Sequence, residues 1–63
     1  MSTVDLVMDM ETLGRLLETM KVPKELRYDY IKALAYLDEN CGTHPDYETA
    51  KKLIKSVASR LNQ

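Results

Sequence analysis

The sequence predicts an all-α fold, a small three-helix bundle formed by a single domain over residues 1–63. Apolar residues recur at the three- and four-residue spacing of amphipathic helices. Turn-forming residues interrupt this pattern at Pro23 and again at Gly42 and Pro45. A chain of 63 residues also has room for only one hydrophobic core. The expected helices cover residues 3–20, 23–40 and 45–61.

The first segment, residues 3–20, carries an apolar stripe that a helix would bury. The members of this stripe are Leu6, Met10, Leu13, Leu17 and Met20. Apolar residues also alternate between residues 4 and 10, as in a strand, but a lone strand would have no sheet to join. A helix is therefore favoured. Gly14 costs this helix about 1 kcal/mol relative to alanine, so we expect it to mark the close approach of a neighbouring helix.

The second segment, residues 23–40, has the clearest core stripe and an apolar surplus. Pro23 suits a first helical turn, where its missing N–H loses no bond. The expected buried face consists of Leu26, Tyr30, Ala33, Leu34 and Leu37. A second apolar strip lies off this face and is formed by Tyr28, Ile31, Ala35 and Tyr36. On one continuous helix, Tyr28, Lys32 and Tyr36 would line a single outward ridge.

The third segment, residues 45–61, places acids near its start and bases near its end, the order that the helix dipole prefers. Its expected buried face consists of Tyr47, Ala50, Ile54, Val57, Ala58 and Leu61. We expect Gly42 to end the preceding helix in the left-handed conformation. Thr43 and Asp46 are expected to form a capping box for the third helix.

The only cysteine and the only histidine stand close together as Cys41 and His44. Structural zinc needs four ligands, so this pair could bind metal only if two such loops met across a dimer axis. A metal-stapled dimer is therefore a minor alternative, and the expectation is that no metal or other cofactor is bound. A single cysteine cannot close an intramolecular disulfide, which favours a reducing compartment.

The composition argues against several functional classes. The chain has no phosphate-binding loop or dinucleotide fingerprint, and Cys41 lies where the helix dipole disfavours a thiolate, so an enzyme is not expected. No apolar run of ~18 residues is present, so no membrane span is expected. The opening stretch MSTVDLVMDMET lacks lysine and arginine, which argues against a secretory signal and favours a cytoplasmic location.

Charge is distributed unevenly along a chain whose net charge is −1. Residues 1–20 are acidic on balance and residues 41–63 are basic. The favoured interpretation is that these charges form solvated helix faces, and the alternative is that the two parts attract each other within the bundle or across a dimer. A basic outward side of the third helix suggests a helix-turn-helix-like DNA-binding regulator as an alternative function. This side carries Lys51, Lys52 and Lys55. The acidic net charge and the acids at the start of that helix argue against it, because they repel phosphates.

The favoured function is that of a small non-enzymatic regulatory or adaptor protein that binds another protein, with the chain itself a homodimer. The association is expected to use surfaces of the first and second helices. Tyrosine is enriched in interface hot spots, and methionine adapts to irregular partners. The expected partner-binding residues are Met8, Met10, Tyr28, Ile31, Lys32, Ala35 and Tyr36.

Overall fold

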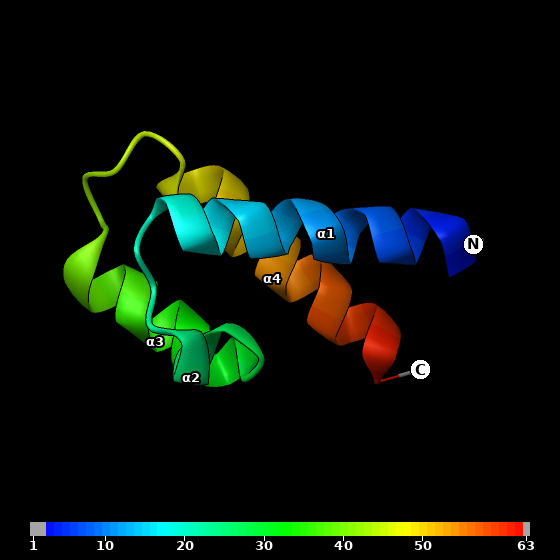
Figure 1. The fold of residues 1–63 in the computed structure, drawn as a ribbon. Coiled ribbons are helices and arrows are strands. Elements are labelled where there is room, and N and C mark those ends of the chain that lie inside the picture. The colour runs from blue at the N-terminus through cyan, green and yellow to red at the C-terminus, as the bar shows by residue number, and fades with distance from the viewer. Residues whose placement is uncertain (1–2, 63) are drawn as a thin grey trace.

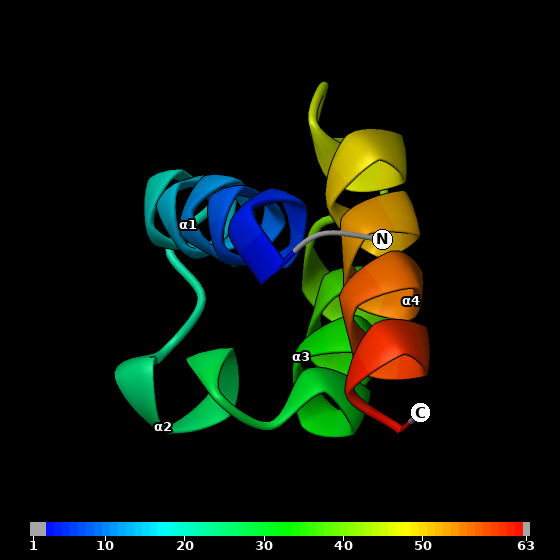
Figure 2. The same ribbon diagram turned by 90° about the vertical axis from the view of Figure 1, so that its right-hand side faces the viewer.

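Four α-helices pack together in residues 3–62, the part of the chain that this computed structural model describes. They are α1 (Thr3–Thr19), α2 (Lys24–Arg27), α3 (Tyr30–Asn40) and α4 (Tyr47–Leu61). The all-α bundle is confirmed, but this part of the chain has four helices rather than the predicted three. α1 crosses α4, α3 packs beside α4, and α2 lies below α1 on the same side of α4 (Figures 1 and 2).

The predicted helix over residues 23–40 is broken between α2 and α3, at Tyr28 and Asp29. The backbone of Asp29 is extended, with φ −111° and ψ 96°, and its side chain accepts a hydrogen bond from the N–H of Lys32 at 3.2 Å. Aspartate is a strong N-cap residue, so Asp29 starts a new helix within an otherwise continuous apolar pattern. The predicted ridge of Tyr28, Lys32 and Tyr36 is therefore wrong, because Tyr28 lies in the break and not on the helix that carries Lys32 and Tyr36.

α1 ends in a Schellman turn at Lys21. The N–H of Val22 donates to the carbonyl of Leu17 at 2.9 Å, and the N–H of Lys21 donates to the carbonyl of Glu18 at 3.0 Å. Lys21 has a φ of 61°, in the left-handed region that side chains with a Cβ disfavour. Leu17 and Val22, the two positions that make the apolar contact of this motif, are both fully buried.

The connection between α3 and α4 differs from both predictions made for it. Gly42 does not have a positive φ, so it does not adopt the left-handed conformation. Asp46 precedes α4 without a side-chain cap, so the capping box with Thr43 does not form. Instead, Nδ1 of His44 accepts a hydrogen bond from the N–H of Asp46 at 3.0 Å. The histidine takes the local role that the sequence assigned to threonine.

The core is aliphatic and lies where α1, α3 and α4 meet. Its buried members are Leu13, Leu17, Met20, Val22, Ala33, Leu37, Cys41, Ala50, Ile54 and Val57. The centre of each predicted stripe is confirmed by this set. The burial of Val22 was not predicted, because this residue lies in a turn outside the periodic segments. Leu61 was predicted to be buried, but it is 50% exposed in the last turn of α4, at the end of the bundle.

Replacing Gly14 with alanine should stabilise the fold. Gly14 does not mark a close approach, since it is exposed and a Cβ there would have no neighbouring heavy atom within 4 Å. Gly14→Ala is therefore expected to raise the free energy of unfolding by about 1 kcal/mol, the difference in helix propensity. Urea denaturation followed by circular dichroism measures this change. A decrease in stability would mean that another chain or segment occupies this space.

Replacing Lys21 with glycine should also stabilise the fold. Glycine removes a left-handed penalty of about 1–2 kcal/mol but loses more chain entropy on folding, so we expect a net gain of about 0.5–1 kcal/mol. Lys21→Ala is the matched control, because it removes the charge and keeps the Cβ. The control should change the free energy of unfolding by less than about 0.5 kcal/mol. Equal effects of the two variants would contradict the assignment of strain to Lys21.

Candidate functional site

Large hydrophobic side chains are exposed around the C-terminal turns of α4. Tyr28 is 88% exposed and Ile31 is 84% exposed. The other exposed large hydrophobic residues in the described part of the chain are Val4, Val7, Met8, Met10 and Leu61. They come from the first half of α1, the α2–α3 corner and the last turn of α4. Within residues 32–60 the described surface exposes no large hydrophobic side chain.

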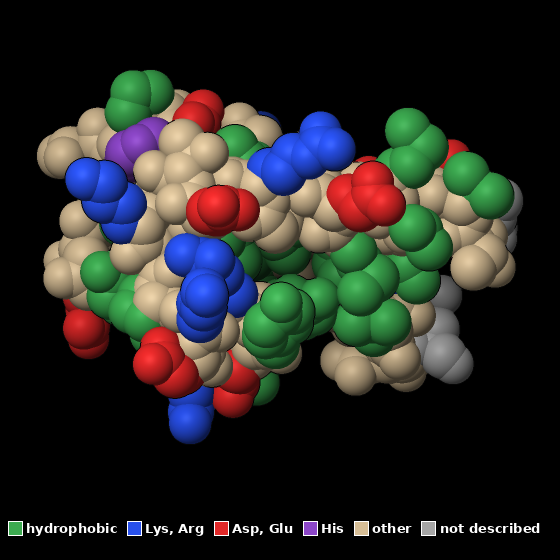
Figure 3. Space-filling view, in the orientation of Figure 1, with side chains coloured by type: hydrophobic (Ala, Val, Ile, Leu, Met, Phe, Trp, Pro, Cys, Tyr) green, Lys and Arg blue, Asp and Glu red, His purple; other side chains and the backbone are tan. Residues whose placement is uncertain are grey.

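The first half of α1 carries apolar side chains on two faces, and Asp5 and Asp9 lie between them. Leu6 packs against the core, whereas Val4, Val7 and Met8 point outward with 65%, 47% and 59% of their surface exposed. Figure 3 shows hydrophobic side chains along this half of the helix and below it. An amphipathic helix usually has one apolar face, so the second apolar face is in excess of what the core buries. We call the outward side chains of Val4, Val7 and Met8 the α1 surface.

An open groove of about 310 Å³ separates the α2–α3 corner from the last turn of α4. It is lined by Tyr28, Asp29, Tyr30, Ile31, Ala58, Leu61 and Asn62. Its walls are mostly apolar, and Asp29 and Asn62 supply the polar groups. The groove brings together residues about thirty positions apart in the sequence, because α3 and α4 pack side by side.

The structure places three of the seven predicted partner-binding residues on these two surfaces. Tyr28 and Ile31 line the groove, and Met8 lies on the α1 surface. Met10 lies on the same half of α1 and is 38% exposed. On α3, the structure leaves Lys32 and Ala35 exposed, while Tyr36 is half-buried against the core.

Sequence reasoning missed Val4, Val7 and Leu61 as surface residues. A signal existed for the two valines, because the helical period does not place them on the stripe of Leu6, Leu13 and Leu17. No comparable signal existed for Leu61, which fits the buried stripe of its own helix.

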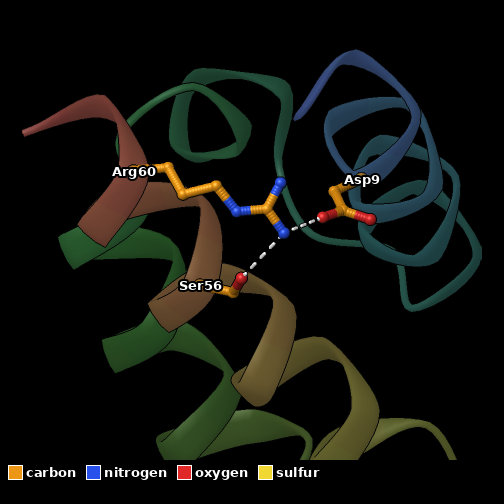
Figure 4. A network of polar contacts seen from close by, with 3 residues as sticks. All are labelled: Asp9, Ser56 and Arg60. Atoms are coloured by element: carbon orange, nitrogen blue, oxygen red, sulfur yellow. Dashed lines mark hydrogen bonds and ion pairs between the residues drawn. The ribbon is translucent and has the colours of Figure 1, made fainter. Parts of the chain in front are cut away.

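An ion pair between Asp9 and Arg60 connects the first half of α1 to α4 (Figure 4). Nη2 of Arg60 donates to Oδ2 of Asp9 and, at 3.3 Å, to Oγ of Ser56. The side chains of Arg60 and Asp9 are only 18% and 31% exposed, and Nη1 of Arg60 is buried without a hydrogen-bond partner. The alternative interpretation, attraction between the acidic first part and the basic last part of the chain within the bundle, therefore holds at this pair.

A polar cluster on the α3–α4 side engages one of the three lysines considered for nucleic-acid binding. Oη of Tyr47 donates to Oδ1 of Asp38 at 2.5 Å and accepts from Nζ of Lys51 at 3.3 Å. The hydrogen bond to Asp38 raises the pKa of Tyr47, and the hydrogen bond to Tyr47 raises the pKa of Lys51. Lys52 and Lys55 are exposed, so the freely presented basic surface of α4 is smaller than the sequence indicates.

Cys41 and His44 are placed by local contacts. The thiol of Cys41 is buried and lies 3.9 Å from the carbonyl oxygen of Met20, within its own chain. His44 uses Nδ1 to accept from the N–H of Asp46. Among the described residues, no three His, Cys, Asp or Glu side chains are grouped so that they could hold a metal ion. A thiol directed inward is poorly placed to share a metal across a dimer axis.

The chain matches no known protein-family model, no curated protein and no solved structure. No helix within residues 3–62 is both long enough and apolar enough to cross a membrane. Six of the seven exposed large hydrophobic residues described lie on the α1 surface or line the groove.

Breaking the ion pair should destabilise the bundle. Asp9→Asn leaves a largely buried guanidinium without its carboxylate, so we expect the free energy of unfolding to fall by about 1–2 kcal/mol. Glu11→Gln, an exposed carboxylate on the same helix, is the control and should change it by less than about 0.5 kcal/mol. The effect of Asp9→Asn should shrink in an Arg60→Gln background. Equal effects in both backgrounds would show that the pair contributes nothing.

Proposed function

We propose that this protein is a small non-enzymatic regulatory or adaptor protein that acts in the cytoplasm by binding another protein, and that the chain is a homodimer. The observation that carries the proposal is the exposed apolar region around the end of α4, with Tyr28 and Ile31 88% and 84% exposed. Tyr28 and Ile31 line one groove with Leu61, and apolar side chains grouped in this way favour an interaction site, because water around them is released when a partner covers them. The buried, unpaired thiol of Cys41 supports a reducing compartment.

The small size of the core supports self-association. The accessible surface is 4517 Å², against roughly 4200 Å² for a typical folded monomer of this mass. A domain of this size buries little apolar surface and often depends on a metal, a disulfide or a second chain. A second copy placed on the apolar region would add that missing burial.

The groove supports binding better than catalysis. Its lining includes no histidine, cysteine or serine that could act as a nucleophile or as the base beside one. Asp29, its one carboxylate, already accepts a hydrogen bond from the backbone of Lys32 as the cap of α3. What the groove offers a ligand is apolar contact with two tyrosines, an isoleucine and a leucine.

Sedimentation equilibrium at micromolar concentration tests the proposal. We expect the mass to be twice that of the 7.3 kDa chain, and to remain so at high salt because apolar contacts are not screened. A monomer at all concentrations would overturn the homodimer. If that monomer also retarded random duplex DNA at low salt, the DNA-binding alternative through Lys52 and Lys55 would replace the proposed function.

A further inference from the structure

We infer that the first two turns of α1 form an arm that opens and closes independently of the core, and that the Asp9–Arg60 ion pair holds it closed. The arm consists of residues 3–10. Opening takes place within one chain and requires no second copy. Because the arm carries the whole α1 surface, the ion pair controls whether that surface is presented on an ordered helix.

Little of the arm is buried. Among residues 3–10 only Leu6 and Asp9 are partly buried, and the other side chains are exposed. The fully buried residues of α1 are Leu13 and Leu17, which lie beyond the arm. The N-terminal end of the arm also projects past the neighbouring helices (Figure 1). Opening of the arm would therefore uncover one leucine and leave the core packed, which is the property of a segment that opens locally.

The arm has a weak preference of its own for the helical state. Val4, Val7 and Asp9 rank below leucine and methionine in helix propensity, because they lose χ1 freedom or favour other local hydrogen bonds. The alternation of apolar residues from Val4 to Met10 fits an extended conformation as well as a helix. Two turns of helix are not stable alone in water. The arm therefore depends on its contacts with the rest of the chain to stay helical.

The geometry of the ion pair allows it to break while α4 stays folded. Nη2 of Arg60 donates to Asp9 on the arm and also to Oγ of Ser56 on its own helix, at 3.3 Å, so it keeps a partner when the arm leaves (Figure 4). Nη1 of Arg60 is buried and has no hydrogen-bond partner among the described residues. Opening would let water reach this donor, which reduces the cost of breaking the pair.

Native-state hydrogen exchange in increasing urea tests whether the arm opens by itself. Within α1 the N–H groups of residues 7–10 donate to carbonyls of residues 3–6, and those of residues 16–18 donate to residues 12–14 beside the core. We expect residues 7–10 to exchange faster and with little dependence on urea, because a local opening exposes little surface. Residues 16–18 should exchange through global unfolding, which depends steeply on urea. One common rate and urea dependence for both groups would overturn the independent arm.

The variant Asp9→Asn tests whether the ion pair holds the arm closed. It should raise the exchange rate of residues 7–10 about 5–30-fold, because only the closed state loses the pair. Glu11→Gln removes an exposed carboxylate from the same helix, so it is the matched control and should change that rate less than about 3-fold. Equal effects of the two variants would mean that the pair does not hold the arm.

A core variant supplies the reciprocal control. Ile54 on α4 is only 2% exposed, and Ile54→Val removes one buried carbon atom. The variant should raise the exchange rate of residues 16–18 roughly 2–10-fold and leave that of residues 7–10 unchanged, because the core stays packed while the arm is open. Circular dichroism should show that the variant remains helical. A matching rise at residues 7–10 would show that they exchange only when the core unfolds, which overturns the inference.

Discussion

The packing of α1 against α4 is the contact on which the rest of the structure depends. Leu13 and Leu17 from α1 and Ile54 and Val57 from α4 supply much of the buried core. At one end of this contact the Schellman turn redirects the chain into α2, and at the other end Asp9 and Arg60 close the edge. Beyond that ion pair Leu6 still packs against the core, whereas Val4, Val7 and Met8 lie off the buried stripe of α1 and stay exposed.

The break at Asp29 decides the shape of the groove. On a continuous helix, Tyr28 would stand on the same ridge as Tyr36, away from the end of α4. Because Asp29 caps a new helix, the chain changes direction, and Tyr28 and Ile31 come to line one hollow with Leu61. A single hydrogen bond from the backbone of Lys32 thus helps to set the surface on which the proposed binding depends.

The sequence predicts the helical class and the centre of the core, because the period of residues such as Leu13, Leu17, Leu37 and Ile54 records which face is buried. It does not reveal the break at Asp29, since one capping residue leaves the apolar period intact. The sequence also does not reveal the left-handed backbone of Lys21, because that conformation is usually predicted from a glycine and none stands there. For the candidate site, the sequence indicates residues 28–31, because they include apolar side chains off the predicted buried face. It does not indicate their neighbours at 58–62, because spacing along a chain does not show which helix ends pack together.

The position of Cys41 gives the molecule an internal reporter. Its thiol lies beneath the turn that joins α1 to α2, beside the carbonyl of Met20. Cys41 is only 8% exposed, so a thiol reagent reacts with it fully only when the packing around it opens. The rate of alkylation of this free cysteine therefore reports local opening of the core in the native chain.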